Sequence, residues 1–285
     1  MNKSLKDCVE HAKSKKVAVG HFNISNSDGF WAVVLGAKEL NVPVIIGASE
    51  GERDFIGARE LAAMVHAYRD FTGQQVYLNA DHTYSFDMVK EVIDMGYDSV
   101  IYDGSALPME ENIKIAKQCV DYARSVNPNI IVEAEIGFIG KSSKLLDVVP
   151  EGVGRLTEVK ESLDFVNETG VDMLAPAVGN VHGIVKGGEP ALNISRIKEI
   201  SDNVKIPLVL HGASGNSDED IRNAIQAGIS IIHINTELRV AYKSGLVKAL
   251  QSDPDEVAPY KYLKGARVSM QKVVEEKLKL FNNIK

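Results

Sequence analysis

Short runs of residues rich in valine and isoleucine alternate along the chain with longer segments whose hydrophobic residues recur at helical spacing. Such alternation is typical of βαβ units around a parallel sheet. Because eight such runs occur, we expect an α/β protein whose strands close into a (β/α)8, or TIM, barrel. The runs are residues 17–22, 42–47, 76–80, 99–102, 130–135, 173–175, 208–211 and 229–234.

The segments between the runs carry the start and stop signals of helices. Ser85 precedes FDMVKEVIDM and Gly96 follows it, and Ser217 and Gly228 bracket DEDIRNAIQA in the same way. A serine suits the first position of a helix and a glycine suits its end. The segment from Tyr260 has an amphipathic pattern, so we expect a C-terminal helical extension.

Length and composition limit the class of protein. With 285 residues, 45% of them hydrophobic, the chain is predicted to form one barrel domain over residues 1–285. A net charge of −7 argues against nucleic-acid binding, which depends on clustered Lys and Arg. Cys8 and Cys119 show no CxxC spacing, the amino terminus lacks a signal-peptide core, and no long apolar run indicates a membrane span. We therefore expect a cytoplasmic protein.

Two long connections follow predicted strands, at residues 138–157 and 176–193. On a barrel, loops after strands lie over the carboxyl face, where they can act as lids. We therefore expect both connections to cover the functional site.

Histidines and acidic residues gather at the ends of the predicted strands, where barrels carry their chemistry. Three neutral imidazoles from separate strands, with one coordination position left open, form a catalytic zinc arrangement. Alternatively, a histidine there can be a satisfied polar residue, Asp81 a strand-end cap, Asp103 a turn residue and Glu135 a partner of a neighbouring cation. The candidates are His21, His82, His182, His211, His233, Asp81, Asp103 and Glu135.

Two glycine-rich segments suggest a phosphate site. HGIVKGG follows the sixth predicted strand and HGASG follows the seventh. Barrels often bind phosphate with the loops after strands seven and eight, although such glycines can also form ordinary turns. The residues predicted to surround an anion are Gly212, Ser214, Asn235 and Thr236.

With these motifs in place, the chain resembles the class II fructose-1,6-bisphosphate and tagatose-1,6-bisphosphate aldolases. The segments FNISN, VIIGASEG, NADHT, DGSALPMEEN, VEAEIGFIG, VGNVHG, PLVLHGASG and TELR occur in family order over nearly the whole chain. The resemblance implies a zinc-dependent carbon–carbon lyase of carbohydrate metabolism and glycolysis. Its reaction would be the reversible cleavage of a ketose bisphosphate, first of all fructose 1,6-bisphosphate, to dihydroxyacetone phosphate and glyceraldehyde 3-phosphate.

The resemblance also implies roles for individual residues. One Zn²⁺ per chain would be held by His82, His182 and His211. Asp81 would act as acid and base on the C4 hydroxyl, and Asp103 and Glu135 would offer an alternate metal position. The residues implied to contact the substrate or its phosphates are Ser49, Gly183, Lys186, Gly212, Ser214, His233, Asn235 and Thr236. Family members often bind Na⁺ or K⁺ and form homodimers or homotetramers.

The chain departs from the family pattern at three places. The segment GKSSKLLDVV lacks the loop glutamate that would exchange the second proton; Lys141, Lys144, Asp147 or Glu151 would have to replace it. His233 stands where an asparagine is usual. SEGE, residues 49–52, replaces the more usual SxGA.

Three rival hypotheses remain at this point. The first is an aldolase of the same scaffold for tagatose 1,6-bisphosphate or another ketose 1-phosphate. The second is a barrel that binds zinc or a sugar phosphate without catalysis, having lost the loop acid. The third is a phosphate-binding isomerase that uses Asp81 and Glu135 without a metal. A substrate screen, an assay of turnover and sensitivity to a chelator separate them.

Overall fold

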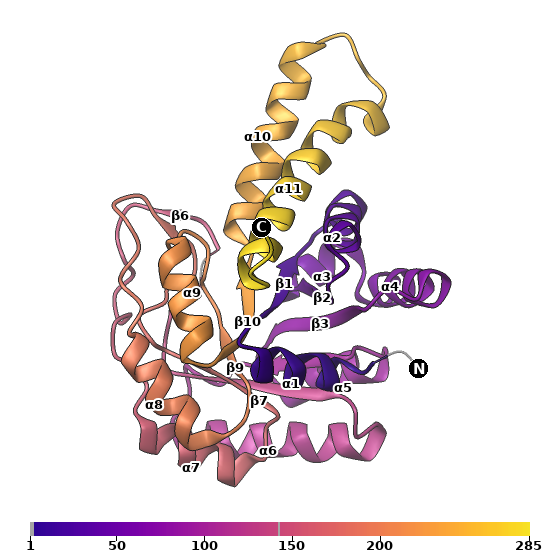
Figure 1. Cartoon of the computed structure of the whole chain (residues 1–285). Coiled ribbons are helices and arrows are strands. Elements are labelled where there is room, and N and C mark those ends of the chain that lie inside the picture. Colours follow the sequence, from indigo (N-terminus) through magenta and orange to yellow (C-terminus); the bar gives the residue numbers. More distant parts are fainter. Residues whose placement is uncertain (1–2, 142) are drawn as a thin grey trace.

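The computed structural model describes residues 3–141 and 143–285 and is built around a closed barrel of parallel strands (Figure 1). Around the barrel the strands follow the order β1-β10-β9-β7-β5-β4-β3-β2. All eight predicted runs form these strands, which confirms the (β/α)8 fold. They are β1 (Val19–Asn23), β2 (Val44–Ala48), β3 (Val76–Thr83), β4 (Ser99–Tyr102), β5 (Ile131–Ile136), β7 (Met173–Pro176), β9 (Leu208–Leu210) and β10 (Ile229–Ile234).

Helices cover the outside of the barrel, and several begin where the sequence indicates. The side chains of Ser85 and Ser217 accept hydrogen bonds from the backbone N–H groups of Met88 and Asp220, as expected of N-caps. The helices of the described residues are α1 (Leu5–Lys15), α2 (Ser27–Leu40), α3 (Glu50–Ile56), α4 (Ala58–Thr72), α5 (Phe86–Asp94), α6 (Met109–Val126), α7 (Val159–Thr169), α8 (Ile194–Val204), α9 (Asp218–Ala227), α10 (Thr236–Ser252) and α11 (Pro259–Phe281).

The inside of the barrel changes from apolar to polar along its axis. At the amino end, helix α1 closes the barrel, and Leu5 and Val9 share one buried cluster with Val19, Ile45 and Ile231 of the strands. Because inward side chains alternate along a strand, the next inward position of each strand lies one layer higher. These higher positions carry His21, Asn79, Glu133 and His233, all of which are buried. The barrel is thus sealed at one end and polar toward the other.

The two long connections predicted to act as lids pair with each other. Strand β6 (Leu145–Leu146) and strand β8 (Ile184–Val185) form a small parallel sheet outside the barrel. This pairing ties the connection after β5 to the connection after β7, and both lie at the carboxyl end of the strands.

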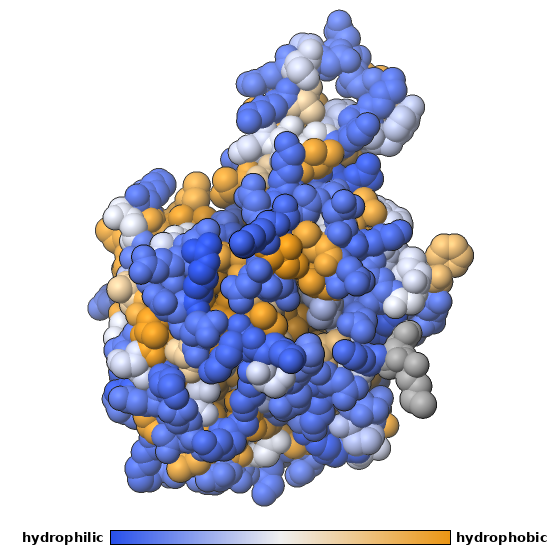
Figure 2. All heavy atoms as spheres, viewed as in Figure 1, coloured by the Kyte–Doolittle hydropathy of each residue, from blue (hydrophilic) through white to orange (hydrophobic). Residues whose placement is uncertain are grey.

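Helices α10 and α11 form a hairpin that extends away from the barrel (Figure 1). Helix α11 matches the predicted C-terminal amphipathic helix and buries Val274, Leu278 and Phe281. Figure 2 shows a mainly hydrophilic face with smaller hydrophobic areas between the polar residues. Among the described residues, no helix has the length and apolar character needed to cross a bilayer.

Candidate active site and metal centre

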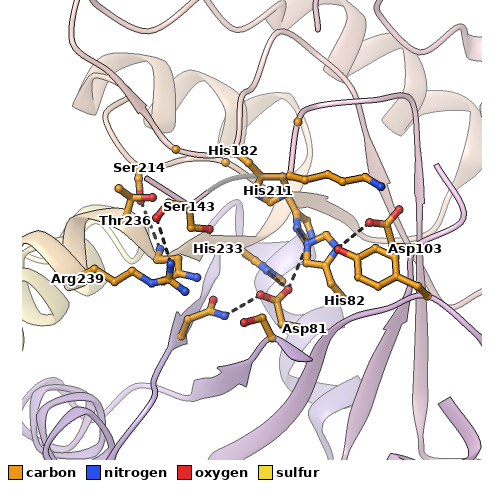
Figure 3. A pocket seen from close by; sticks show the side chains of 18 residues that line it. Asp81, His82, Asp103, Ser143, His182, His211, Ser214, His233, Thr236 and Arg239 are labelled. Atoms are coloured by element: carbon orange, nitrogen blue, oxygen red, sulfur yellow. Dashed lines mark hydrogen bonds and ion pairs between the residues drawn. The ribbon is translucent and has the colours of Figure 1, made fainter. Parts of the chain in front are cut away.

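One pocket at the carboxyl end of the barrel collects most of the predicted site residues (Figure 3). Its walls come from the ends of β1, β2, β3, β9 and β10 and from the two long connections, as expected for a barrel. The lining residues are Asn23, Ser49, Asp81, His82, Tyr84, Asp103, Gly140, Lys141, Ser143, His182, Gly183, His211, Gly212, Ser214, His233, Asn235, Thr236 and Arg239.

Three histidines and one glutamate converge at the centre of the site. His82, His182, His211 and Glu135 each offer a ligand atom, and these atoms all lie within 4.8 Å of one another. Nε2 of His82 lies 3.2 Å from Nδ1 of His211, and Nε2 of His182 lies 4.0 Å from Oε2 of Glu135. The last two atoms are buried and have no hydrogen-bond partner among the residues that the structure describes. Imidazole and carboxylate donors at this spacing fit a zinc ion.

Carboxylates behind two of these histidines fix their ring orientation. Nδ1 of His82 lies 3.0 Å from Oδ2 of Asp103, and Nε2 of His211 lies 2.7 Å from Oε1 of Glu133. Carboxylates of this kind set the tautomer of a metal-binding histidine and raise its basicity. Asp103 therefore lies behind His82 in this structure, outside the group of four converging atoms.

The backbone of β3 explains how adjacent residues reach the same pocket. In a regular strand Asp81 and His82 would face opposite sides. His82 instead has a φ of +101°, and the pairing register between β3 and β4 shifts between Ala80 and Thr83. A positive φ is costly for a residue with a side chain and persists where surrounding contacts enforce it. The irregularity turns His82 into the pocket beside Asp81.

In the protein without metal, the three histidines differ in their protonation state. Burial lowers the pKa of His182 and of His211 to about 3, so both imidazoles are neutral and can donate a lone pair. Burial also opposes charge on His82, but the carboxylates of Asp81 and Asp103 outweigh it and raise the pKa of His82 to about 10. A metal ion at this position would therefore have to displace the proton of His82.

Asp81 combines one restrained oxygen with one free oxygen. Oδ2 accepts a hydrogen bond from Nδ2 of Asn23 at 2.7 Å, whereas Oδ1 has no hydrogen-bond partner within the described part of the chain. Oδ1 lies 3.6 Å from Nε2 of His82 and 3.4 Å from Nδ1 of His233. Burial opposes the charge of Asp81, yet His82 and His233 outweigh it and hold the pKa of this carboxyl well below its usual range. Asp81 is thus an ionised base directed at the centre of the site.

His233 belongs to a stack of three imidazoles. Its ring is parallel to that of His21, with centroids 3.5 Å apart, and it lies 3.9 Å from the ring of His211 on the other side. Strands β1 and β10 place His21 and His233 in register. Burial lowers the pKa of His21 and holds that of His233 well below its usual range, so the stacked rings are neutral. His233 therefore both lines the pocket and packs in the barrel interior.

The predicted anion loops lie together at the amino end of α10. Gly183, Gly212, Ser214, Asn235 and Thr236 all line the pocket. Gly212 has a φ of +61°, and a Cβ there would lie only 2.3 Å from a backbone oxygen, so only glycine fits this turn. The start of a helix favours bound anions because its first backbone N–H groups are unpaired and its dipole is positive there.

Lys186 and Ser49 differ from the expectation for phosphate contacts. Lys186 lies outside the residues that line the pocket, and its Nζ pairs with Asp147 of the neighbouring connection at 2.7 Å. Ser49 lines the pocket, but its N–H and its hydroxyl both donate to Oε2 of Glu52, at 2.8 and 2.9 Å. Ser49 thus has both donors occupied in this arrangement, whereas the exposed ammonium of Lys186 keeps further donors, and phosphate binding by both residues stays a prediction.

Of the four candidates for the second proton carrier, Lys141 alone among the described residues lines the pocket. Its Nζ lies 5.7 Å from the centre of the Tyr84 ring. Lys144, Asp147 and Glu151 are exposed to solvent in the same connection. Lys141 is therefore the candidate that this arrangement of the loop favours.

Several residues near the site were missed from the sequence. Glu133 precedes Glu135 by two residues on β5, so period-two alternation alone could have placed both inside the barrel. Asn23 directly follows the first predicted run, residues 17–22, so its strand-end position was open to the same kind of reasoning. The contacts of Glu52 and Arg239 join segments far apart in the chain, so no local sequence pattern predicts these contacts.

Comparisons with known proteins agree with this geometry. Residues 3–285 match the family described as fructose-bisphosphate aldolase class-II. Over 283 residues the chain is 38% identical to a fructose-bisphosphate aldolase of Geobacillus stearothermophilus, covering 98% of this chain and 96% of the relative. A fructose-bisphosphate aldolase of Staphylococcus epidermidis is 37% identical over 281 residues, with the same shares covered.

Solved structures give the same result for the fold. The crystal structure of the YdjI aldolase from Escherichia coli K12 is 32% identical and superposes with a TM-score of 0.84, covering 99% of this chain and 97% of that one. Fructose-bisphosphate aldolase from Campylobacter jejuni, at 22% identity, has a TM-score of 0.81 over 98% of this chain and 94% of its own. The second likeness concerns the fold alone.

Proposed function

Because the chain belongs to the class II fructose-bisphosphate aldolase family, a family of zinc-dependent lyases that act on sugar phosphates, we propose that this pocket is its catalytic site. The observation that carries the proposal is the placement of Asp81 beside the converging donors of His82, His182 and His211. The reaction is the reversible cleavage of a ketose bisphosphate, fructose 1,6-bisphosphate first, to dihydroxyacetone phosphate and glyceraldehyde 3-phosphate.

The metal position follows from the donors. We assign His82, His182 and His211 as zinc ligands, with Glu135 and Asp103 able to serve an alternate position. When bound, the zinc ion supplies a Lewis acid for the ketone oxygen and for the negative charge that develops during cleavage.

The protein's own residues then account for the proton transfers. Oδ1 of Asp81 takes the proton of the C4 hydroxyl, the C4–O electrons form the aldehyde, and the C3–C4 bonding pair stays on C3. A proton delivered to C3 completes dihydroxyacetone phosphate. Lys141 is our candidate for this second transfer, since it is the acid–base candidate of the loop that faces the pocket.

Substrate binding is assigned to the walls of the pocket. The glycine-rich turns and the start of α10 suit the phosphate of the three-carbon fragment. The residues proposed to bind substrate are Gly183, Gly212, Ser214, His233, Asn235 and Thr236, with Ser49 and Lys186 as further phosphate contacts once their present partners release them.

A second candidate substrate is a ketose 1-phosphate. Both donors of Ser49 are bonded to the carboxylate of Glu52, which is buried and also accepts a hydrogen bond from Nδ2 of Asn23, the partner of Asp81. A second phosphate near Ser49 would meet this negative charge, with Arg239 as the nearby compensating cation. This arrangement favours an aldolase of the same scaffold whose substrate has one phosphate.

A coupled assay on the zinc-loaded enzyme tests these proposals. Turnover of fructose 1,6-bisphosphate, tagatose 1,6-bisphosphate and fructose 1-phosphate is measured side by side, before and after exhaustive treatment with EDTA. We expect activity on at least one substrate, lost with EDTA and restored by zinc. Inactivity on every ketose phosphate would overturn the function, and activity that survives EDTA would overturn the zinc mechanism.

Three further assignments complete the proposal. We propose a homodimer or homotetramer, which the exposed Val257 and Tyr260 at the tip of the α10–α11 hairpin support. A monovalent cation, Na⁺ or K⁺, is proposed from the family resemblance. A cytoplasmic location is supported by Cys8 and Cys119, which are both buried and free.

A further inference from the structure

Glu52 lies at the far end of a buried hydrogen-bond chain that reaches Asp81. Its Oε2 accepts a hydrogen bond from Nδ2 of Asn23 at 2.8 Å, and the same nitrogen donates to Oδ2 of Asp81 at 2.7 Å. The three residues are between 3% and 7% exposed, so water competes little for these bonds. A single amide nitrogen thus links the carboxylate of Glu52 on helix α3 to that of Asp81 on strand β3.

The two carboxylates determine which way the Asn23 amide faces. An ionised carboxylate only accepts hydrogen bonds. The NH₂ group of Asn23 must therefore face both carboxylates and donate one hydrogen to each. Oδ1 of Asn23 is buried and finds no hydrogen-bond partner in residues 3–141 and 143–285, which makes this orientation energetically unfavourable for the amide itself. With only one carboxylate present, the amide could turn to satisfy its oxygen elsewhere.

Glu52 is itself held firmly at both oxygens. Oε2 also accepts from the N–H and hydroxyl of Ser49, and Oε1 accepts from Nη2 of Arg239 at 2.5 Å. Nη1 of Arg239 in turn donates to the backbone oxygen of Ser143 at 3.1 Å. Glu52 is therefore a fixed point to which Asn23 is attached.

We propose that Glu52 is a positioning residue for carbon–carbon cleavage. Through Asn23 it restrains Oδ2 of Asp81 and leaves Oδ1 free to meet the C4 hydroxyl. The inference rests on the proposed role of Asp81.

The test is Glu52→Gln in the zinc-loaded full-length enzyme. Glutamine keeps the size of the side chain but removes an obligate acceptor, so the Asn23 amide can turn and Asp81 loses its restraint. Because small misplacements of a catalytic group are costly, we expect kcat for cleavage to fall about 10- to 100-fold, with KM and zinc content nearly unchanged. Asp54→Asn, the same chemical change at an exposed site of α3, should have no effect.

A second readout separates positioning from general damage. Dihydroxyacetone phosphate has no C4 hydroxyl, so release of tritium from its C3 carbon does not require Asp81 as a base. Glu52→Gln should retain this exchange while losing cleavage. Equal losses of both activities, or no loss of cleavage, would overturn the inference. If Glu52→Gln does not fold, Asn23→Ala cuts the same chain and must show the same selective loss.

These outcomes also distinguish this inference from the proposed function. A wild-type enzyme inactive on every ketose phosphate would defeat the function itself. A wild-type enzyme that is active, together with a Glu52→Gln variant of normal kcat, would defeat only the positioning role.

Discussion

The carboxyl end of the barrel has two halves that are built on different principles. The metal half comprises His82, His182, His211, Glu133 and Glu135. The stack half comprises His21, His233, Asn23, Gly47 and Glu52. In the metal half, carboxylates bond to two of the imidazoles, whereas in the stack half neutral rings pack face to face.

Buried polar atoms without a hydrogen-bond partner among the described residues indicate which half can bind a metal ion. In the metal half, His182 Nε2 and Glu135 Oε2 face a common centre, where a metal ion would satisfy both. In the stack half, Nδ1 of His21 and of His233 lie on parallel rings, and a single ion cannot lie in both ring planes. We infer that substitutions in the metal half abolish zinc binding or turnover. Substitutions in the stack half should instead alter packing and substrate preference.

The largest effect is expected from His211→Ala, which removes a ligand. We expect the purified variant to contain almost no zinc and to show no turnover above background, because a remaining pair of histidines binds the ion too weakly. Metal analysis and the coupled assay measure both quantities. Full zinc content in this variant would remove His211 from the ligand set.

Asp81→Asn should separate metal binding from proton transfer. The amide has nearly the same shape but cannot accept the proton of the C4 hydroxyl, so we expect kcat to fall about 10²- to 10⁴-fold. Zinc content should stay at the wild-type level, which metal analysis determines. A variant with more than a tenth of wild-type kcat would show that another group is the base.

Glu133→Gln tests the support behind the metal half. Glu133 holds Nε2 of His211 at 2.7 Å, and loss of such a carboxylate costs about 10- to 100-fold in metal affinity or activity. Competition with a chelator of known affinity measures the change. An affinity within threefold of wild type would mean that His211 is oriented without Glu133.

The sequence predicted the barrel more completely than the site because the two depend on different information. Runs of valine and isoleucine between helix signals are local, so all eight strands could be placed. The pairing of Leu145 with Ile184 joins two-residue strands 39 positions apart, and no local pattern indicates it.

The same distinction applies to individual site residues. His82, Asp81 and His211 could be predicted because they stand at strand ends and within recognisable motifs. The rotation of His82 into the pocket depends on a positive φ, which the sequence of β3 does not reveal. Lys186 has the charge and loop position expected of a phosphate contact, and its pairing with Asp147 of the other connection is not indicated by any local pattern. Glu52 likewise acquires its role only through the contact with Asn23.

The dependence of zinc affinity on pH should come from the metal half alone. In the protein without metal the pKa of His82 is raised to about 10, above its ordinary value of 6.5. Protonation of His82 therefore stabilises the folded protein without metal. The stabilisation is fully present below pH 6.5 and is lost as the pH rises through 10. Zinc must displace the proton, so affinity should rise by at least about tenfold per pH unit between pH 7 and 9.

Chelator competition at several pH values checks this slope. His233→Asn is the matched variant from the stack half, and because its ring is neutral the slope should not change. An affinity that is flat with pH would show that His82 carries no proton in the protein without metal.

The smallest effect on catalysis, and a clear one on stability, is expected from Gly47→Ala. A Cβ at Gly47 would lie 2.0 Å from Cε1 of His21, so the ring must move off His233. Overpacking of this kind costs about 1–3 kcal/mol, and for a chain of this size each kcal/mol lowers Tm by about 2–4 °C. Gly51→Ala is the control, since a Cβ there meets nothing within 4 Å and alanine favours helix α3.

Thermal unfolding of both variants, with and without zinc, measures this difference. Gly47→Ala should melt earlier than wild type while its zinc content stays complete, because the three atoms nearest to a Cβ at Gly47 all belong to His21. Loss of zinc as large as that in Glu133→Gln would contradict the division into two halves. The stack of His21, His233 and His211 would then transmit packing changes to the metal ligands, and the two regions would have to be treated as one unit.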